Sequence, residues 1–246
     1  MADYKFPTEM VELPSKGYFY VDGHPLSEGK VEVKYMTARE EDILTSQNLI
    51  QQGLVIEKLL QSLIVDKSIN IDDLLIGDKN AIMVASRILG YGKDYEFTYD
   101  GEEQTVDLSK LEPMDIDFSK FPKGINKFTF ELPNSERIIV FKLLDGKDEK
   151  KIDAEIKAKQ KISKEQSTEL TTRLKQMILS VDSKSEKVYI NNFVDNEFLS
   201  VDSLAFRQHL SSITPDVDMT AQIIDSTGKE IEVTIPVTLR FFWPSA

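Results

Sequence analysis

The sequence predicts an α+β protein of two similar repeats, each with a strand, about three helices and a β-hairpin. Three observations support this prediction: a strand pattern runs into a helix-start motif twice, apolar helix patterns follow both times, and each half ends in a hairpin pattern. Pro, Gly and Lys cluster at 119–127, so we expect an N-terminal α+β repeat at residues 1–122 and a C-terminal one at 123–246.

The first strand and helix are predicted from residues 30–42, which follow a Pro- and Gly-rich stretch of turns. Residues 30–36 alternate apolar and polar side chains, as a half-buried strand does. Thr37 and Glu40 then have the spacing of a capping box, in which each side chain binds the other's backbone amide. Glu41 and Asp42 fall in the same first helical turn, where the helix dipole favours negative charge.

A second copy of this pattern occurs 108 positions later. The shift aligns apolar positions of the two strands, and Asp145 takes the position of the helix cap. It also aligns Arg39-Glu40-Glu41 with Lys147-Asp148-Glu149. The alternative is a single α+β domain whose helix caps are similar by accident, because capping boxes are common.

Apolar spacing predicts the remaining helices. One is expected over 54–65, and its counterpart is expected to begin near a capping box at 163–166 and to carry an apolar stripe through Ile178 and Val181. A third helix is predicted from an N-cap at Asp78 to Gly90, and its counterpart from Asp202 to before Pro215.

Hairpin patterns follow both third helices. The first covers 95–108 with a turn at Asp100-Gly101, and the second covers 221–235 with a turn at 226–228. The segments near the start of the two repeats, VELP at 11–14 and FELP at 130–133, are also similar in sequence.

Composition excludes several classes of function. The net charge of −12 disfavours a nucleic-acid partner, and the absence of cysteine excludes disulfides and thiolate metal sites. Residues 1–10 lack a secretory pattern and no apolar run reaches 18 residues, so we expect a soluble intracellular protein without membrane contact.

No motif in the sequence predicts catalysis, a cofactor, a metal ion or a small-molecule substrate. Only two histidines occur, His24 and His209, and neither lies in a GxSxG, HExxH or phosphate-loop context. The alternating acid pairs at 115/117 and 216/218 could bind a hard cation, but such pairs are more often a solvated strand face.

The C-terminal aromatic run Phe241, Phe242 and Trp243 has two interpretations. It is either a last strand or tail docked on the body, or an anchor that faces a partner, because Phe and Trp are frequent in binding hot spots. Residues 147–164 mix both charge signs at helical spacing, which is typical of an exposed helix.

Several long strings resemble a known family. They are LPSKGYFY at 13–20, VEVKYMTAREEDILTSQNLIQQG at 31–53, DLLIGDKNAIMVASRILGYGKDYEF at 73–97, TTRLKQMILSVD at 171–182, FVDNEFLSVDSLAFR at 193–207, TPDVDM at 214–219 and the terminal FFWP. Over nearly the whole chain the sequence resembles the baseplate hub assembly proteins of T-even-type contractile-tailed phages. Some relatives carry paired cysteines in the hairpins, as in a zinc ribbon; this chain has none, so the resemblance implies no metal here.

The resemblance implies a non-enzymatic viral protein of tail assembly. Its partners would be other phage baseplate hub or tail proteins, and its place would be the host cytoplasm during assembly or the tail baseplate of the virion. It could be a hub subunit, or a transient assembly chaperone absent from the mature particle; a hydrolase or metal-dependent enzyme is a further alternative. The predicted partner-binding residues are Arg39, Glu40, Glu41, Asp42, Lys147, Asp148, Glu149, Phe241, Phe242 and Trp243.

Overall fold

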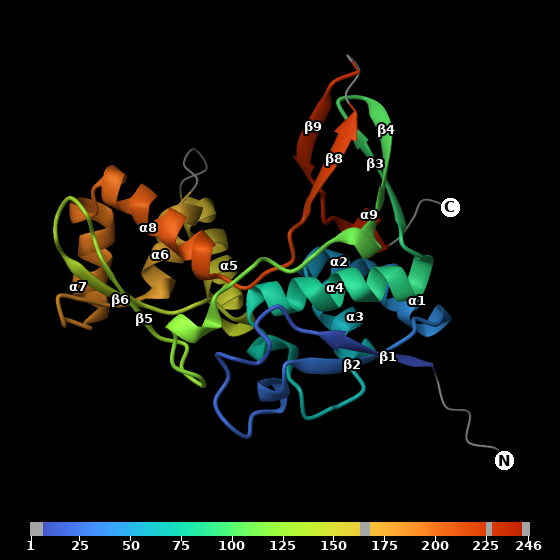
Figure 1. Cartoon of the computed structure of the whole chain (residues 1–246), viewed down its shortest axis with the longest axis horizontal. Helices are drawn as coiled ribbons and strands as arrows, with labels where there is room; N and C mark the ends of the chain where they lie inside the picture. The colour runs from blue at the N-terminus through green and yellow to red at the C-terminus, as the bar shows by residue number, and fades with distance from the viewer. Residues whose placement is uncertain (1–6, 163–167, 225–227, 243–246) are drawn as a thin grey trace.

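The protein has an α+β architecture in which helices pack against small antiparallel sheets (Figure 1). The computed structural model describes residues 7–162, 168–224 and 228–242. Helices and strands of the two halves of the chain lie side by side, and two β-hairpins stand over the first half (Figure 1). The predicted α+β class is therefore confirmed.

The first half begins with two paired strands, β1 (Thr8–Glu12) and β2 (Lys30–Lys34). Val11 lies opposite Val31, and the strand alternation turns both toward the core. The chain after α3 returns to this sheet, because Ile64 forms a bridge with Val33. The helices of this half are α1 (Ala38–Leu44), α2 (Gln47–Gln52), α3 (Val55–Leu63), η2 (Ile71–Asp73) and α4 (Ile76–Tyr91), and η1 (Pro25–Glu28) precedes β2.

The second half also begins with two paired strands followed by helices. Strands β5 (Phe128–Glu131) and β6 (Ile138–Phe141) pair antiparallel, and β7 (Ile178–Val181) joins β6 as a third strand. Its helices are α5 (Gly146–Ile162), α6 (Glu169–Met177), α7 (Lys187–Asn192), η5 (Phe193–Glu197) and α8 (Ser200–Ile213). The second half differs from the first in having strand β7 between α6 and α7, and a common repeat unit stays a prediction.

Two local predictions were wrong. Ile178 to Val181 form a strand rather than the end of a helix, because pairing with β6 satisfies their backbone. Asp78 lies in the first turn of α4 and Leu75 caps this helix. Of the two docked forms expected for the aromatic run, a strand or a tail, the described part is not a strand but a short helix, α9 (Leu239–Phe242). The predicted helix start at 163–166 lies outside the described residues.

Both hairpins form as predicted, but they lie together. Strand β3 (Asp94–Tyr99) pairs with β4 (Glu102–Asp107), and the positive φ angles of Asp100 and Gly101 suit the tight turn between them. Strands β8 (Thr220–Ile224) and β9 (Glu230–Thr234) form the second hairpin, whose tip is partly outside the described residues.

The second hairpin stands beside the first one (Figure 1). The Tyr95 hydroxyl donates to the Pro236 carbonyl at 3.0 Å, and the Gln104 amide donates to the Ile224 carbonyl at 3.2 Å. The C-terminal segment therefore packs on the first half of the chain, so contacts cross the predicted division at residue 122. The short turns η3 (Leu108–Lys110) and η4 (Phe118–Lys120) lie between β4 and β5.

In each half, a buried aspartate at the third position of α4 or α8 binds the segment that follows the first strand. The Asp78 carboxylate accepts hydrogen bonds from the Ser15 amide at 2.9 Å, the Ser15 hydroxyl at 2.7 Å and the Tyr20 hydroxyl at 2.6 Å. In the second half, Asp202 accepts from the amides of Asn134 and Ser135 at 2.8 and 3.1 Å. Each aspartate thus ties a strand end to a helix start that is about 65 residues away.

Replacement of Asp78 with Ala should reveal how much this tie contributes. The substitution leaves the Ser15 amide and the Tyr20 hydroxyl buried without an acceptor, so we expect the free energy of unfolding to fall by about 3 kcal/mol. Urea unfolding followed by circular dichroism measures the change. Asp42→Ala, at an exposed carboxylate on α1, is the control and should change stability by less than about 0.5 kcal/mol. A similarly small loss for Asp78→Ala would contradict the role of the tie.

Candidate functional site

The first predicted acidic cluster is largely a structural feature. Glu40 is fully buried, and its carboxylate accepts hydrogen bonds from the Lys34 ammonium at 2.8 Å, the Ser62 hydroxyl at 2.8 Å and the Thr37 amide at 3.0 Å. Burial alone would raise the pKa of the Glu40 carboxyl, but the hydrogen bonds from Lys34, Thr37 and Ser62 outweigh it and lower the pKa to about 2. The capping box is therefore confirmed, and Glu40 is withdrawn as a partner-facing residue.

The rest of this cluster lies at the surface. Arg39 and Asp42 are exposed, and Glu41 is half-buried and accepts a hydrogen bond from the Tyr91 hydroxyl at 3.2 Å. Arg39 forms no ion pair within the described residues, so its charge is available to a partner.

The second cluster is built in the same way. Asp148 is buried, pairs with Lys142 and accepts from the Gln176 amide at 2.9 Å. Burial raises the pKa of the Asp148 carboxyl, but the bonds from Lys142 and Gln176 outweigh it and lower this pKa. Since Asp148 is enclosed by its own half, the expectation that it faces a partner is corrected.

The neighbours of Asp148 bind within the chain. Lys147 forms an ion pair with Asp73 of the first half. Glu149 binds the Arg173 guanidinium with both carboxylate oxygens, at 2.5 and 3.0 Å. Lys147 and Glu149 therefore serve the internal packing, although the side chain of Lys147 stays half-exposed.

The aromatic run does not present its first two rings to solvent. Phe241 and Phe242 are fully buried, and the Phe241 ring packs on Tyr95 with centroids 4.9 Å apart. Helix α9 lies against α4 and the bases of the hairpins (Figure 1). The docked interpretation holds for these two residues and corrects the anchor interpretation, whereas Trp243 lies outside the described residues.

The remaining ionisable candidates do not converge. His209 stacks on Phe130 with centroids 4.5 Å apart, and burial lowers the pKa of its imidazole. Asp216 accepts from the Asn80 amide at 2.9 Å, and burial raises the pKa of its carboxyl. Within the described ranges, no group of three or more acids and histidines is placed to hold a metal ion.

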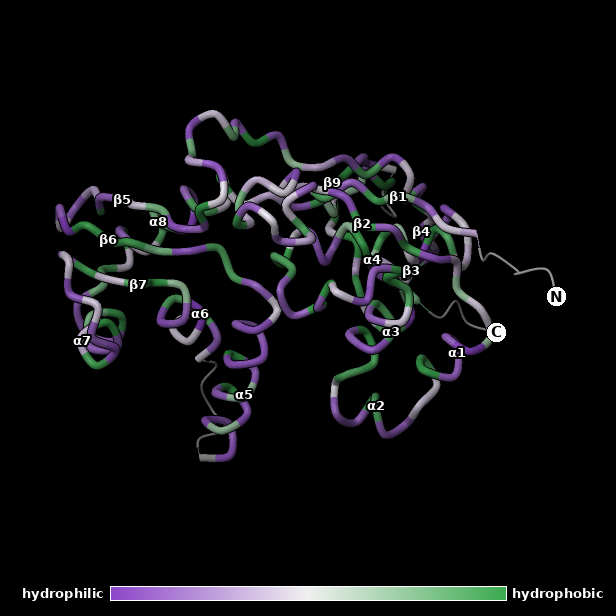
Figure 2. Tube along the Cα trace, turned by 90° about the horizontal axis from the view of Figure 1, so that it is seen from below, coloured by the Kyte–Doolittle hydropathy of each residue, from purple (hydrophilic) through white to green (hydrophobic). Residues whose placement is uncertain are grey.

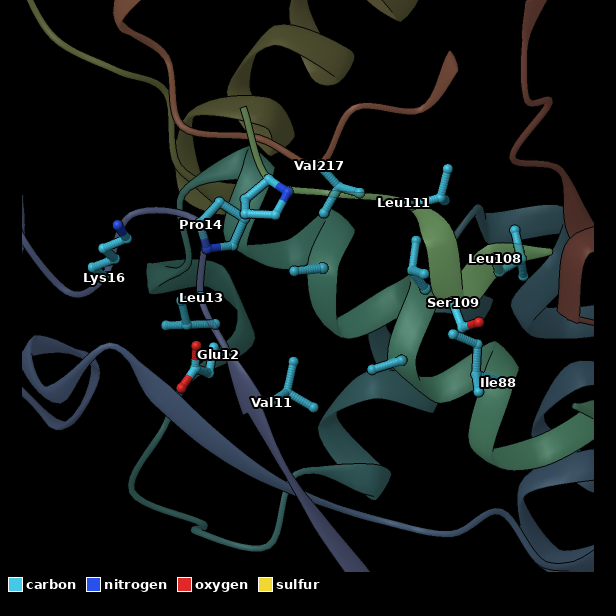
Figure 3. A pocket seen from close by; sticks show the side chains of 14 residues that line it. Val11, Glu12, Leu13, Pro14, Lys16, Ile88, Leu108, Ser109, Leu111 and Val217 are labelled. Carbon is cyan, nitrogen blue, oxygen red and sulfur yellow. The ribbon is translucent and has the colours of Figure 1, made fainter. Parts of the chain in front are cut away.

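An apolar groove, lined mainly by the first half of the chain with Val217 from the second half, was not predicted from the sequence. It has a volume of about 300 Å³ and runs between the end of β1, the outer face of α4 and the segment after β4 (Figure 3). Polar side chains contribute only Glu12, Lys16 and Ser109 to its lining. The apolar lining consists of Val11, Leu13, Pro14, Ala81, Val84, Ala85, Ile88, Leu108, Leu111, Pro113 and Val217.

The groove follows from the sequence of α4. Ala81, Val84, Ala85 and Ile88 recur at helical spacing, so they share one face of this helix. Alanine side chains are short, and they leave the hollow between α4 and the segment that carries Leu111. An apolar hollow with polar groups in a minority suits contact with apolar side chains of another molecule.

Comparison with protein-family models, with curated proteins and with solved structures finds no match to this chain.

The structure contains, among its described residues, no helix long and apolar enough to cross a bilayer. Along the Cα trace, hydrophobic residues concentrate in strands such as β6 and β7, whereas most of α5 is hydrophilic (Figure 2).

The charge network around Glu40 predicts a pH dependence of stability. Because the pKa of Glu40 is lowered from 4.5 to about 2 by folding, its contribution is fully present above pH 4.5 and is lost as the pH falls toward 2. Glu40→Gln is neutral at every pH, so the wild type should exceed it by roughly 3 kcal/mol at neutral pH and by much less near pH 3. Urea unfolding at a series of pH values measures the difference, with Asp42→Asn as the exposed control. A difference that is constant from pH 7 to pH 3 would refute the assignment.

Proposed function

We propose that this protein is a non-enzymatic assembly protein of a phage tail baseplate hub, which acts by binding other hub or tail proteins. The observation that carries the proposal is the resemblance of seven sequence strings, spread from residue 13 to the C-terminus, to the hub assembly proteins of T-even-type phages.

The internal pairing of the predicted acidic residues supports a non-enzymatic role. The buried carboxylates of Glu40 and Asp148 form ion pairs with lysines, and the carboxylate of Glu149 forms an ion pair with Arg173. These groups stabilise helix starts and the packing of the chain. A carboxylate that is enclosed by hydrogen-bond donors has little freedom to transfer protons to a substrate.

The apolar groove supports the same role and supplies a contact surface. Its walls come from β1, α4 and the segment after β4, all of which are fixed by the buried core. A partner that inserts apolar side chains would remove both surfaces from water, at about 25 cal/mol per Å² of apolar area. Exposed charges around the groove would then set the orientation of the partner.

Leu111→Arg tests the groove as a hub-protein contact. Leu111 is half-buried at the rim, so the arginine should leave the fold intact while it places a charge where apolar side chains would bind. We expect recovery of hub proteins, in affinity purification from infected cells followed by mass spectrometry, to fall at least about tenfold, which corresponds to 1.4 kcal/mol.

Val188→Arg is the matched control, because Val188 is 82% exposed on α7, away from the groove. This variant should recover hub proteins as the wild type does. Recovery of no hub or tail protein by the wild type would overturn the proposed function. Detection of the protein in purified particles identifies a subunit, and its absence from them identifies a chaperone.

A further inference from the structure

The two halves of the chain meet through a short backbone pairing. Leu75, just before α4, lies antiparallel to Asp145, just before α5. The Ile76 amide donates to the Leu144 carbonyl at 3.3 Å, and the Gly146 amide donates to the Leu74 carbonyl at 3.1 Å. We call this pairing of 74–76 with 144–146 the internal junction.

Side chains make the internal junction tight and specific. Lys147 pairs with Asp73 beside it, and Lys150 reaches Asp72 at 2.7 Å and Glu57 at 3.0 Å. A Cβ on Gly146 would lie only 2.9 Å from the Cα of Asp72, so the backbones are in close contact. The junction is therefore a built interface with apolar, backbone and ionic parts.

Each half of the chain contains one segment that corresponds in sequence to 74–76 and one that corresponds to 144–146. The shift of 108 that aligns Lys34–Glu40 with Lys142–Asp148 places Thr37 at the position of Asp145. The shift of 124 that aligns Asp78 with Asp202 places Leu199 at the position of Leu75. We call 36–39 the front face and 197–201 the rear face.

Among the described residues, neither the front face nor the rear face forms a backbone bridge like that of the internal junction, although Met36 packs against Gly90 of α4. The two faces lie at the starts of α1 and α8, which are at opposite ends of the molecule (Figure 1). Leu199 is 46% exposed and Val201 is 55% exposed, whereas Leu75 is only 5% exposed in the internal junction. Among the described residues, the amides of Ala38 and Ser200 have no hydrogen-bond partner, although those of Gly146 and Ile76 are paired.

Charges on the two faces are complementary. Arg39 stands where Lys147 does, and Glu197 stands where Asp73 does, so the same pair of signs would meet. One oxygen of Glu197 binds Arg137 at 2.6 Å and the other accepts from the Asn192 amide at 2.6 Å, but the side chain is 40% exposed and can still approach a second cation. The halves differ too, because 1–122 has 23 acidic and 12 basic residues whereas 123–246 has 19 and 18.

We propose that the rear face of one copy binds the front face of a second copy, in the manner of the internal junction. The contact is head to tail, so it leaves a free front face and a free rear face at the ends and can extend to a ring or a filament. Ala38 carries a side chain where Gly146 has none, so the backbones stay further apart and the contact is weaker than the internal one.

Cysteine cross-linking tests the contact, because the natural chain has no cysteine. Directly opposed residues of an antiparallel pair have Cα atoms about 5 Å apart, which suits a disulfide. We expect purified Thr37→Cys/Leu199→Cys to form dimers and larger ladders on mild oxidation. Leu75→Cys/Asp145→Cys is the positive control and should close within one chain, because these residues are paired in the internal junction.

Thr37→Cys/Val188→Cys is the mismatched control, since Val188 is highly exposed but lies outside the rear face. The proposal is supported if the matched pair gives several times more cross-linked oligomer than this control. It is overturned if the matched pair gives no excess while the positive control closes. Circular dichroism verifies that each variant is folded.

A second variant avoids the capping residue Thr37. Leu199→Asp is exposed and should preserve the fold, and we expect it to abolish concentration-dependent association in sedimentation velocity. Equal association of this variant and the wild type would contradict the proposal. Both experiments use the purified chain alone, so their failure leaves the hub-protein contact at the groove unaffected.

Discussion

The structure depends on a carboxylate buried in the first turn of each long helix. Asp78 binds the turn that follows β1, and Asp202 binds the turn that follows β5. A buried carboxylate is costly unless donors surround it, and here the donors are backbone amides and hydroxyls of a distant turn. The strand end and the helix start are thereby held together across the chain.

The environments of the two aspartates differ. Burial raises the pKa of Asp78, because its donors include two hydroxyls and no cation. Burial also acts to raise the pKa of Asp202, but the hydrogen bonds from Asn134 and Ser135 outweigh it and the pKa is lowered. The fixed turn after β1 forms one wall of the groove, so the tie at Asp78 also shapes the candidate contact site.

Structural features that depend only on neighbouring residues were predicted correctly from the sequence. The capping box at Thr37 and the tight turn at Asp100-Gly101 need only neighbouring residues, and both are present. The burial of Glu40 depends on Ser62, which is distant in sequence, and the strand at Ile178 depends on pairing with β6. An apolar run of this length fits a helix or a strand equally well until its partner is known.

The candidate site was harder to predict from the sequence than the fold. The stripe of Ala81, Val84, Ala85 and Ile88 marks a helix face, but the hollow over it also depends on the segment near Leu111, which is distant in sequence. Phe241 and Phe242 have the composition of an anchor, yet the hairpin bases bury them. Binding surfaces arise from what other elements leave uncovered, and a single segment does not contain that information.

Amide hydrogen exchange at Ser15 and Asn134 tests the central tie most directly. Both residues lie in turns, where amides ordinarily exchange fast, but here each amide donates to a buried aspartate. We expect both to exchange slowly, at rates close to those of core amides in β2 and β6, as measured by nuclear magnetic resonance. Exchange of both at the rate of an unstructured peptide would show that the carboxylates do not hold these turns.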